Sequence, residues 1–98
     1  MFVAIRYYQT APDSIGEVVN RVKEDFVPII RDTQGFVSYF ILTPSDREGE
    51  LVSVSVFESR EGAEESNQRA EDWVRQNLSE LLLLPEFAEG EVVVYEAK

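Results

Sequence analysis

Hydrophobic and polar positions along the chain predict four strands and two helices. β-Branched and aromatic residues dominate residues 2–9, 36–43, 51–58 and 91–96, and turn-forming residues bound these runs, which is typical of strands. Apolar residues recur at helical spacing over residues 15–30 and again over residues 60–81. The expected order of elements is therefore β-α-β-β-α-β.

The predicted helices carry recognisable start and stop signals. Ser14 and Glu17 have the spacing of a capping box, and Ser59 can cap the second helix. Pro28 lies inside the first helix and is expected to remove a hydrogen bond and bend it. Gly35 is suited to the positive φ that often follows the end of a helix.

This order of elements corresponds to the ferredoxin-like arrangement, an α+β fold. It has a four-stranded antiparallel sheet with both helices on one face. The polar residues 44–50 are expected to join two strands as a hairpin, and residues 85–90 to form a loop before the last strand. No linker or low-complexity segment interrupts the chain, so we expect a single domain over residues 1–98.

Successive side chains of a strand point to opposite faces of the sheet, and here both of these alternating sets are largely apolar. This is unusual for a sheet covered by helices on one face only. We expect the uncovered face to carry Phe2, Phe36, Phe40, Leu42, Leu51 and Phe57. Such a patch is too large to leave in water, so the sequence predicts a homodimer in which two sheets pack face to face. The alternative is that serines of the third strand face solvent and the aromatic residues are scattered.

The second helix places polar residues on its apolar side. Asn67 and Asn77 fall within the stripe that should face the sheet, with Ser66 and Trp73 at its edge. A buried amide needs hydrogen-bond partners, so one interpretation is a ligand pocket in which the Trp73 indole N–H and the Asn77 amide orient a small molecule. The alternative is that Trp73 is a core anchor and the asparagines bond to nearby backbone.

Three strand residues are further candidates for ligand binding. Tyr7 and Tyr39 can add hydroxyl groups to the pocket if their alternating set faces the helices. Arg6 lies on the face assigned above to the dimer, beside Tyr8. Arg6 can bind an anionic substrate group, or it can pair with a carboxylate across the subunit interface, which is the favoured interpretation.

Composition removes many kinds of chemistry. The 98 residues contain no cysteine and no histidine, which removes disulfides, thiolate sites and histidine as base, zinc ligand or haem ligand. No phosphate loop, nucleophile elbow or metal-ligand spacing occurs, so we expect no metal and no cofactor.

The chain is strongly acidic. Nine Lys and Arg residues against nineteen Asp and Glu residues give a net charge of −10, so nucleic acid and anionic membrane surfaces are unfavourable partners. The first residues show no basic segment followed by a long apolar one. A cytoplasmic location is therefore expected.

Three segments of the sequence are characteristic when taken together: GFVSY at residues 35–39, VSVFESREGA at residues 54–63 and SNQRAEDWV at residues 66–74. In this combination they resemble the antibiotic biosynthesis monooxygenase (ABM) family of dimeric α/β barrels. The resemblance covers nearly the whole chain and implies a ferredoxin-like protomer and a sheet-to-sheet homodimer. It also implies an oxygenase that works without metal, flavin or haem on aromatic, polyketide-like substrates.

The resemblance implies roles for several residues. In such enzymes the deprotonated substrate supplies electrons to oxygen, and Trp73, Asn77 and Tyr39 are the catalytic candidates here. Asn67, Ser66, Tyr7 and Arg6 are the candidates for substrate binding. A haem-degrading branch of the family uses a haem-ligating histidine, which this sequence lacks.

Two functional hypotheses follow from these observations. The first is a cofactor-independent monooxygenase for a small aromatic substrate. The second is a non-catalytic dimeric module that holds a small molecule or a partner. A polycyclic substrate needs a pocket of a few hundred Å³ beside Trp73, whereas a filled core there favours the second hypothesis.

Overall fold

The computed structural model describes residues 1–81 and 86–98 and confirms the ferredoxin-like α+β fold. Its four strands form one antiparallel sheet in the order β2-β3-β1-β4. The strands are β1 (Phe2–Gln9), β2 (Phe36–Leu42), β3 (Glu50–Phe57) and β4 (Glu86–Glu91). Strands β2 and β3 pair as the hairpin that the sequence predicts.

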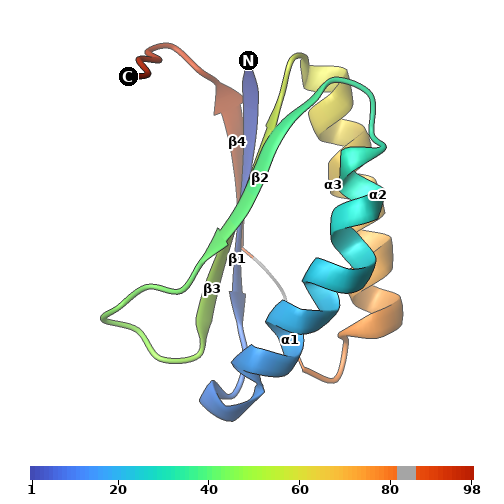
Figure 1. Ribbon diagram of the computed structural model, residues 1–98, viewed down its shortest axis with the longest axis vertical. Helices are drawn as coiled ribbons and strands as arrows, with labels where there is room; N and C mark the ends of the chain where they lie inside the picture. Colours follow the sequence, from blue (N-terminus) through green and yellow to red (C-terminus); the bar gives the residue numbers. More distant parts are fainter. Residues whose placement is uncertain (82–85) are drawn as a thin grey trace.

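Three helices lie together on one side of the sheet (Figure 1). They are α1 (Ile15–Arg21), α2 (Val27–Arg31) and α3 (Arg60–Asn77). In the part of the chain that the structure describes, no helix combines the length and the apolar character needed to cross a membrane.

The first predicted helix is a series of helical segments instead of one continuous helix. A 3-10 turn, η1 (Pro12–Ser14), precedes α1, and a π-helical turn, η2 (Val22–Phe26), joins α1 to α2. At the end of η2 the N–H of Val27 donates to the carbonyl of Val22, five residues earlier. Pro28 follows directly and has no N–H to donate, so the predicted irregularity takes the form of a π turn.

The helix caps agree with the sequence in one case and differ in the other. Ser59 caps α3 as predicted, because its hydroxyl accepts a hydrogen bond from the N–H of Gly62 at 3.4 Å. The capping box at Ser14 is wrong: Ser14 has helical backbone angles at the end of η1 and forms no side-chain cap. Glu17 instead pairs with Arg21 at 2.7 Å. Helix α3 ends at Asn77, four residues before the predicted end.

The fourth strand lies earlier in the chain than the sequence suggests. The prediction of a loop over residues 85–90 and a strand over 91–96 is wrong for the described residues, since β4 spans Glu86–Glu91; residue 85 lies outside them. Strand β1 provides the reason. Glu91 pairs with Phe2 and the N–H of Val92 reaches the carbonyl of Met1, so β1 has no backbone left to pair with residues 93–96.

The two faces of the sheet carry different residues from those predicted. Phe2, Phe36, Leu51 and Phe57 do not form the uncovered face, because they pack into the core under the helices, where Phe57 is fully buried. Only Phe40 and Leu42 of the predicted set lie on the far side, and Phe40 is 51% exposed.

A β-bulge and two serines explain this difference. The register slips between Phe36 and Ser38, so Phe36 and Tyr39 both contact the core although they are three residues apart. In β3, Ser53 and Ser55 share a face with Leu51 and Phe57, and they are buried under the helices. Small polar side chains on the inner face leave room for the large side chains of the helices.

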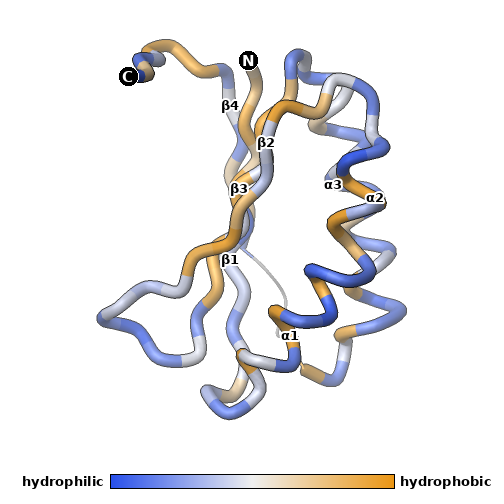
Figure 2. The backbone as a smooth tube through the Cα atoms, in the orientation of Figure 1, coloured by the Kyte–Doolittle hydropathy of each residue, from blue (hydrophilic) through white to orange (hydrophobic). Residues whose placement is uncertain are grey.

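The side of the sheet away from the helices is nevertheless apolar. We call this surface the open face; it consists of Val3, Ile5, Tyr7, Phe40, Leu42, Val52, Val54 and Val56. Hydrophobic residues run along these strands and continue into the C-terminal segment, which turns away from the helices (Figure 2). In that segment Val93, Val94 and Tyr95 are exposed. The prediction of a sheet that is apolar on both sides is thus correct, although four of its six residues were assigned to the wrong side.

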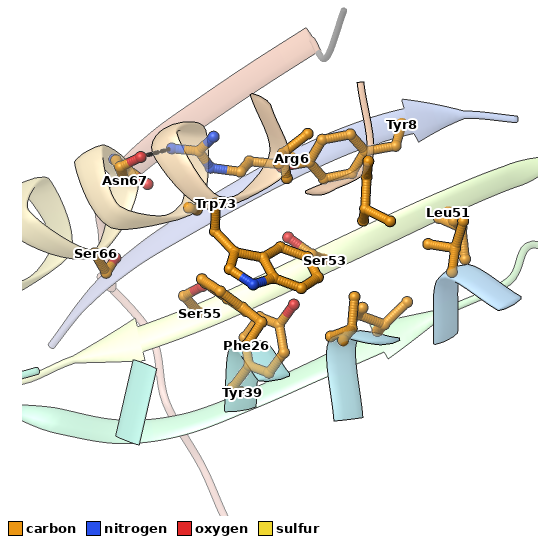
Figure 3. A pocket seen from close by; sticks show the side chains of 16 residues that line it. Arg6, Tyr8, Phe26, Tyr39, Leu51, Ser53, Ser55, Ser66, Asn67 and Trp73 are labelled. Atoms are coloured by element: carbon orange, nitrogen blue, oxygen red, sulfur yellow. Dashed lines mark hydrogen bonds between the residues drawn. The ribbon is translucent and has the colours of Figure 1, made fainter. Parts of the chain in front are cut away.

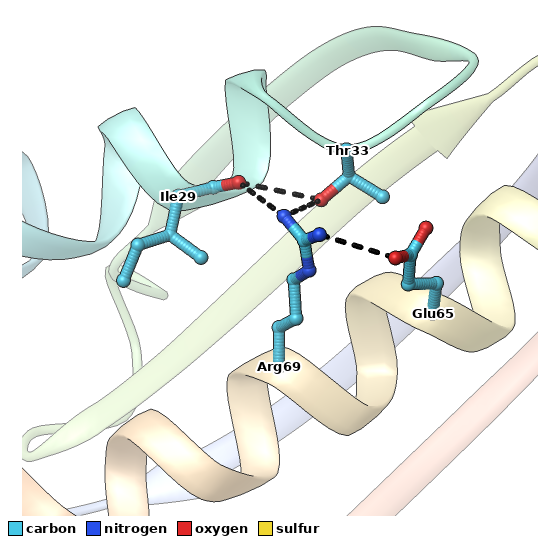
Figure 4. A network of polar contacts seen from close by, with 4 residues as sticks. All are labelled: Ile29, Thr33, Glu65 and Arg69. Carbon is cyan, nitrogen blue, oxygen red and sulfur yellow. Dashed lines mark hydrogen bonds and ion pairs between the residues drawn. The ribbon is translucent and has the colours of Figure 1, made fainter.

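Arg69 ties α3 to the end of α2 (Figure 4). Its guanidinium donates to the carbonyl of Ile29 at 3.4 Å and to the hydroxyl of Thr33 at 3.3 Å, and it pairs with Glu65 at 3.1 Å. The last carbonyl groups of a helix lack partners within it, so this arginine satisfies one of them and fixes α3 beside α2.

Gly62 is expected to be essential for the approach of α3 to the rest of the fold. A Cβ at this position would lie 2.5 Å from the carbonyl oxygen of Gln34 and 3.1 Å from the Phe57 ring. We expect Gly62→Ala to lower the free energy of unfolding by about 1–3 kcal/mol in denaturant titrations. Gly16→Ala is the control, because nothing lies within 4 Å of its Cβ, and it should leave stability unchanged or raise it. Equal stability of both variants would contradict the close contact.

Candidate functional site

A small cavity lies between the sheet and α3, close to Trp73 (Figure 3). Its volume is about 30 Å³. The walls come from β1, β2, β3, α1, η2 and α3, and most are apolar; the polar side chains around it are Arg6, Tyr8, Tyr39, Ser53, Ser55, Ser66 and Asn67. A space of this size holds one or two water molecules and no aromatic ring.

Trp73 forms one wall of the cavity as part of an aromatic cluster. Its ring lies 5.4 Å from the ring of Phe26, which in turn lies 5.7 Å from the ring of Tyr39 in an edge-to-face arrangement. None of the side-chain hydrogen bonds seen among residues 1–81 and 86–98 involves the indole N–H. Trp73 therefore packs in the core and also lines the cavity, so the core-anchor interpretation and the pocket interpretation each describe part of its position.

Tyr39 also lines the cavity. Its side chain therefore lies on the side of β2 that faces the helices, which was the condition for a role in the pocket. Burial raises the pKa of the Tyr39 hydroxyl well above the usual range of a tyrosine, and Tyr8 adds to this effect. A hydrogen bond with Ser53 and the positive charge of Arg6 act in the opposite direction, but burial dominates. Tyr39 is consequently a neutral hydrogen-bond donor near neutral pH and not a base.

Arg6 lies on the helix side of the sheet, so its predicted place on the dimer face is wrong. Its side chain is buried, and its Nη2 donates to the carbonyl oxygen of Asn67 in α3 at 2.7 Å. Its guanidinium carbon lies 5.3 Å from the centre of the Phe87 ring. The favoured interpretation, a carboxylate partner across the sheet interface, fails because Arg6 points away from the open face.

Ser66 and Asn67 line the cavity as predicted, each held by a second contact. The Ser66 hydroxyl donates to the carbonyl of Ala63 at 2.8 Å, which leaves its oxygen free to accept another bond. The Asn67 amide donates to Glu89 of β4 at 3.3 Å. These contacts fix both side chains along the inner edge of α3.

Asn77 and Tyr7 lie outside the cavity. The Asn77 amide donates to the carbonyl of Trp73 at 2.9 Å, and its own carbonyl accepts from Arg21 of α1, so Asn77 is an exposed helix-end residue. For Asn77 the alternative interpretation is therefore correct: its side chain bonds to nearby backbone and does not line the pocket. Tyr7 is 37% exposed on the open face, because neighbouring residues of β1 point to opposite sides.

An open groove adjoins the cavity on the outside. It has a volume of about 350 Å³, and its lining residues are Arg6, Glu64, Asn67, Gln68, Glu71, Phe87 and Glu89. Arg6 and Asn67 line both the groove and the cavity and therefore separate the two spaces. A ligand that reached Trp73 from this side would pass these two residues.

Sequence reasoning did not assign Ser53, Ser55, Tyr8 and Phe87 to the site. The serines alternate with valines in β3, a pattern that reads equally well as a solvent-facing edge, and Phe87 lies in a segment expected to be a loop. Within residues 1–81 and 86–98 there is no group of three or more potential metal ligands.

Comparison with known proteins agrees with this architecture. The family model described as "Antibiotic biosynthesis monooxygenase" matches residues 1–73. No curated protein matches the sequence.

Several solved structures share the fold over nearly their whole length. A MhuD variant with two manganese protoporphyrin IX molecules bound per active site is 17% identical, with a TM-score of 0.82 and 100% of both chains covered. A dimeric ferredoxin-like protein from an uncultured marine organism is 12% identical, with a TM-score of 0.78 and 100% of both chains covered. SnoaB, a cofactor-independent oxygenase from Streptomyces nogalater, is 15% identical with a TM-score of 0.73, and the match covers 99% of this chain and 97% of SnoaB. At these low sequence identities, the TM-scores show that the proteins share a fold.

The raised pKa of Tyr39 predicts an effect of alkali on stability. The unfolded chain ionises this tyrosine near its ordinary pKa of about 10, whereas the folded chain keeps the proton to higher pH. Stability supplied by the neutral Tyr39 is therefore complete below pH 10 and falls as the pH rises above it. We expect Tyr39→Phe to lose less stability than wild type between pH 9 and pH 11 in denaturant titrations. Parallel curves for the two proteins would contradict the buried, neutral state.

Proposed function

The chain belongs to the antibiotic biosynthesis monooxygenase family, and from that premise we propose that it oxidises a small aromatic or polyketide-like substrate with molecular oxygen, without a metal or organic cofactor. The observation that carries the proposal is the convergence of Tyr39, Trp73 and Ser53 on one buried cavity with apolar walls. An aromatic ring requires such walls, and a few polar groups are enough to fix its orientation.

The proposed reaction needs no external reductant. A phenol or enol that has lost its proton gives electrons to O₂, and a C–O bond forms at a ring carbon. Loss of water from the resulting hydroperoxide leaves a carbonyl group. One O₂ is consumed and one water is formed for each C–H that becomes C=O, so the substrate supplies every electron.

Tyr39 and Trp73 have distinct roles in this proposal. Tyr39 stays protonated because burial raises its pKa, so its O–H can donate to an oxygen anion on the substrate or on bound peroxide. Trp73 supplies a flat wall against which a ring can stack. Asn77 was a catalytic candidate from the sequence. Its side-chain amide donates to the backbone carbonyl of Trp73, so we assign it no direct role in the reaction.

The volume of the cavity limits the substrate. At about 30 Å³ it admits no aromatic ring in this conformation, whereas the adjoining groove of about 350 Å³ accommodates a single ring with its substituents. The proposed substrate is therefore a small phenol or hydroquinone that enters from the groove. Movement of Arg6 and Asn67 opens the path to Trp73.

A haem is a poor fit to this site, although one structural relative binds manganese protoporphyrin. The sequence contains no histidine or cysteine to act as axial ligand, and the cavity is far smaller than a macrocycle. No step of the proposed reaction is routed through such a group.

The small cavity also supports a second candidate function, a non-catalytic module that binds a small molecule. An almost filled space beside Trp73 is the feature expected of this alternative. The two functions differ in oxygen consumption, because a binding module holds the same ligand without consuming O₂.

The open face supports a homodimer as part of either function. Phe40, Leu42 and Tyr7 are exposed there in the single chain, together with five half-buried aliphatic side chains. The fold relative from the marine organism is dimeric. A second copy of this chain presents a surface of the same shape and chemistry, so face-to-face packing covers both patches by one symmetric contact.

Oxygen uptake tests the proposed activity. We expect uptake with at least one member of a panel that runs from simple hydroquinones to anthrone, and Trp73→Phe should lower the rate at least about tenfold by loosening ring placement. Tyr39→Phe should lower it by a similar factor, because a hydrogen bond to a charged group is worth about 1.5–3 kcal/mol. Tyr7→Phe removes the same hydroxyl from the open face and should leave the rate within about twofold. Binding without uptake across the panel would reject the oxygenase and favour the binding module.

Light scattering tests the proposed dimer. We expect a mass of twice 11.2 kDa for wild type and a monomer for Phe40→Asp, since a carboxylate in the apolar contact stays unpaired and buried. Gln76→Asp adds the same charge to an exposed position on α3 and should remain dimeric. A monomeric wild type would contradict the open face as an interface.

A further inference from the structure

The cavity beside Trp73 has the dimensions of a very small molecule. Its volume of about 30 Å³ excludes an aromatic ring but is sufficient for a molecule of two heavy atoms. Large apolar side chains form most of its wall, among them Val18, Leu51 and Leu78, each of which is at most 2% exposed. The site is therefore both small and well shielded from bulk solvent.

Most polar side chains around the cavity are already bonded to other parts of the protein. The Ser66 hydroxyl donates to the backbone one turn earlier, and the Asn67 amide donates to Glu89. Tyr39 and Ser53 are hydrogen-bonded to each other. A buried water needs about two to four polar partners, so a wall of this kind favours an uncharged molecule that needs few hydrogen bonds.

The proposed reaction brings two substrates into contact, an aromatic ring and O₂. The groove of about 350 Å³ accommodates the ring, whereas the cavity of about 30 Å³ does not. Arg6 and Asn67 line both spaces and lie at their boundary (Figure 3). When these two side chains move aside, the edge of a ring in the groove meets a small molecule in the cavity.

From these observations we propose that the cavity beside Trp73 binds dioxygen while the aromatic ring stays in the groove. Dioxygen is uncharged, apolar and diatomic, which are the properties that the size and the walls of the cavity select. The inference rests on the proposed function and assigns a place to its second substrate.

Arg6 has a defined position in the resulting oxygen transfer. The deprotonated ring carbon supplies the electron pair of the new C–O bond, and the negative charge moves to the outer oxygen of O₂. The Arg6 guanidinium lies at the boundary where this peroxide anion forms, and only one of its five N–H donors is used by the carbonyl of Asn67. The peroxide anion then takes a proton from water in the open groove, which replaces the proton that the substrate released to water.

Krypton tests the cavity without any turnover. It is an uncharged, apolar atom similar in size to O₂, and its anomalous scattering locates it in crystals. We expect krypton under pressure to occupy the cavity beside Trp73 in crystals of the wild-type protein, because apolar cavities bind such atoms. Crystals in which krypton does not enter this cavity, with or without a bound water there, would overturn the proposal.

Matched variants assign krypton binding to the cavity. Ser55→Leu extends a larger apolar side chain into it from β3 and should abolish krypton binding there. Ala70→Val fills part of the same space from α3, which provides a test if Ser55→Leu does not fold. Ser45→Leu makes the first substitution at an exposed position between β2 and β3 and should retain krypton. Undiminished krypton in both filled variants would overturn the proposal.

Ring binding distinguishes the cavity from the groove. We expect Ser55→Leu to bind p-nitrophenol, a single-ring phenol, within about twofold of the wild-type Kd, whereas Phe87→Ala should weaken this binding at least about fivefold by removing the aromatic wall of the groove. Phe87→Ala should also retain krypton. Weaker p-nitrophenol binding in Ser55→Leu would place the ring in the cavity and overturn the proposal, as would unchanged binding in Phe87→Ala.

The dependence of the rate on O₂ connects the cavity to the reaction. With a hydroquinone at saturation, Ser55→Leu should raise the KM for O₂ at least about fivefold and leave the KM for the hydroquinone within about twofold. An unchanged KM for O₂ would overturn the inference and leave the oxygenase in place. Krypton binding without O₂ uptake for any aromatic substrate would instead reject the proposed function, whereas the cavity would stand as a site for small apolar molecules.

Discussion

The geometry of the site depends on which side of each strand the helices cover. Neighbouring residues in a strand point to opposite sides, so covering one side of β1 buries Arg6 and leaves Tyr7 on the open face. The same constraint in β3 places Ser53 and Ser55 under α3, where large aromatic side chains from the helices fill the space above them. A buried arginine, a buried tyrosine and an apolar outer surface all follow from this one choice.

Much of the fold was predictable from the sequence, whereas the choice of face was not. Helical spacing, the Ser59 cap and the polar hairpin segment are local signals, and they gave the order of elements correctly. When both sets of a strand are apolar, the alternation does not say which set faces the helices, so Phe57 and Arg6 were assigned to the wrong side. The bulge at Val37 and the end of β1 opposite Glu91 depend on pairing between distant residues, which local patterns do not contain.

The candidate site was predictable in part for the same reason. Trp73, Ser66, Asn67 and Tyr39 were recognised and do line the cavity, because polar residues on an apolar helix face indicate a special environment. Asn77 was assigned to the cavity on a regular helical wheel, but it is the last residue of α3 and bonds to the backbone one turn earlier. A helical wheel predicts the direction in which a side chain points. Whether other residues cover that side chain depends on where the helix ends, and the wheel does not contain this information.

Trp73 is the only tryptophan of the chain and lies at the wall of the cavity, so its fluorescence reports directly on whether ligands bind there. Titration of the protein with p-nitrophenol, a nitroaromatic quencher, is the most direct measurement of the central claim that the space between the sheet and α3 is a ligand site. We expect quenching that saturates at a defined ligand concentration and disappears when a competing hydroquinone fills the site. Quenching that rises linearly without saturation, as in random collisions, would contradict it.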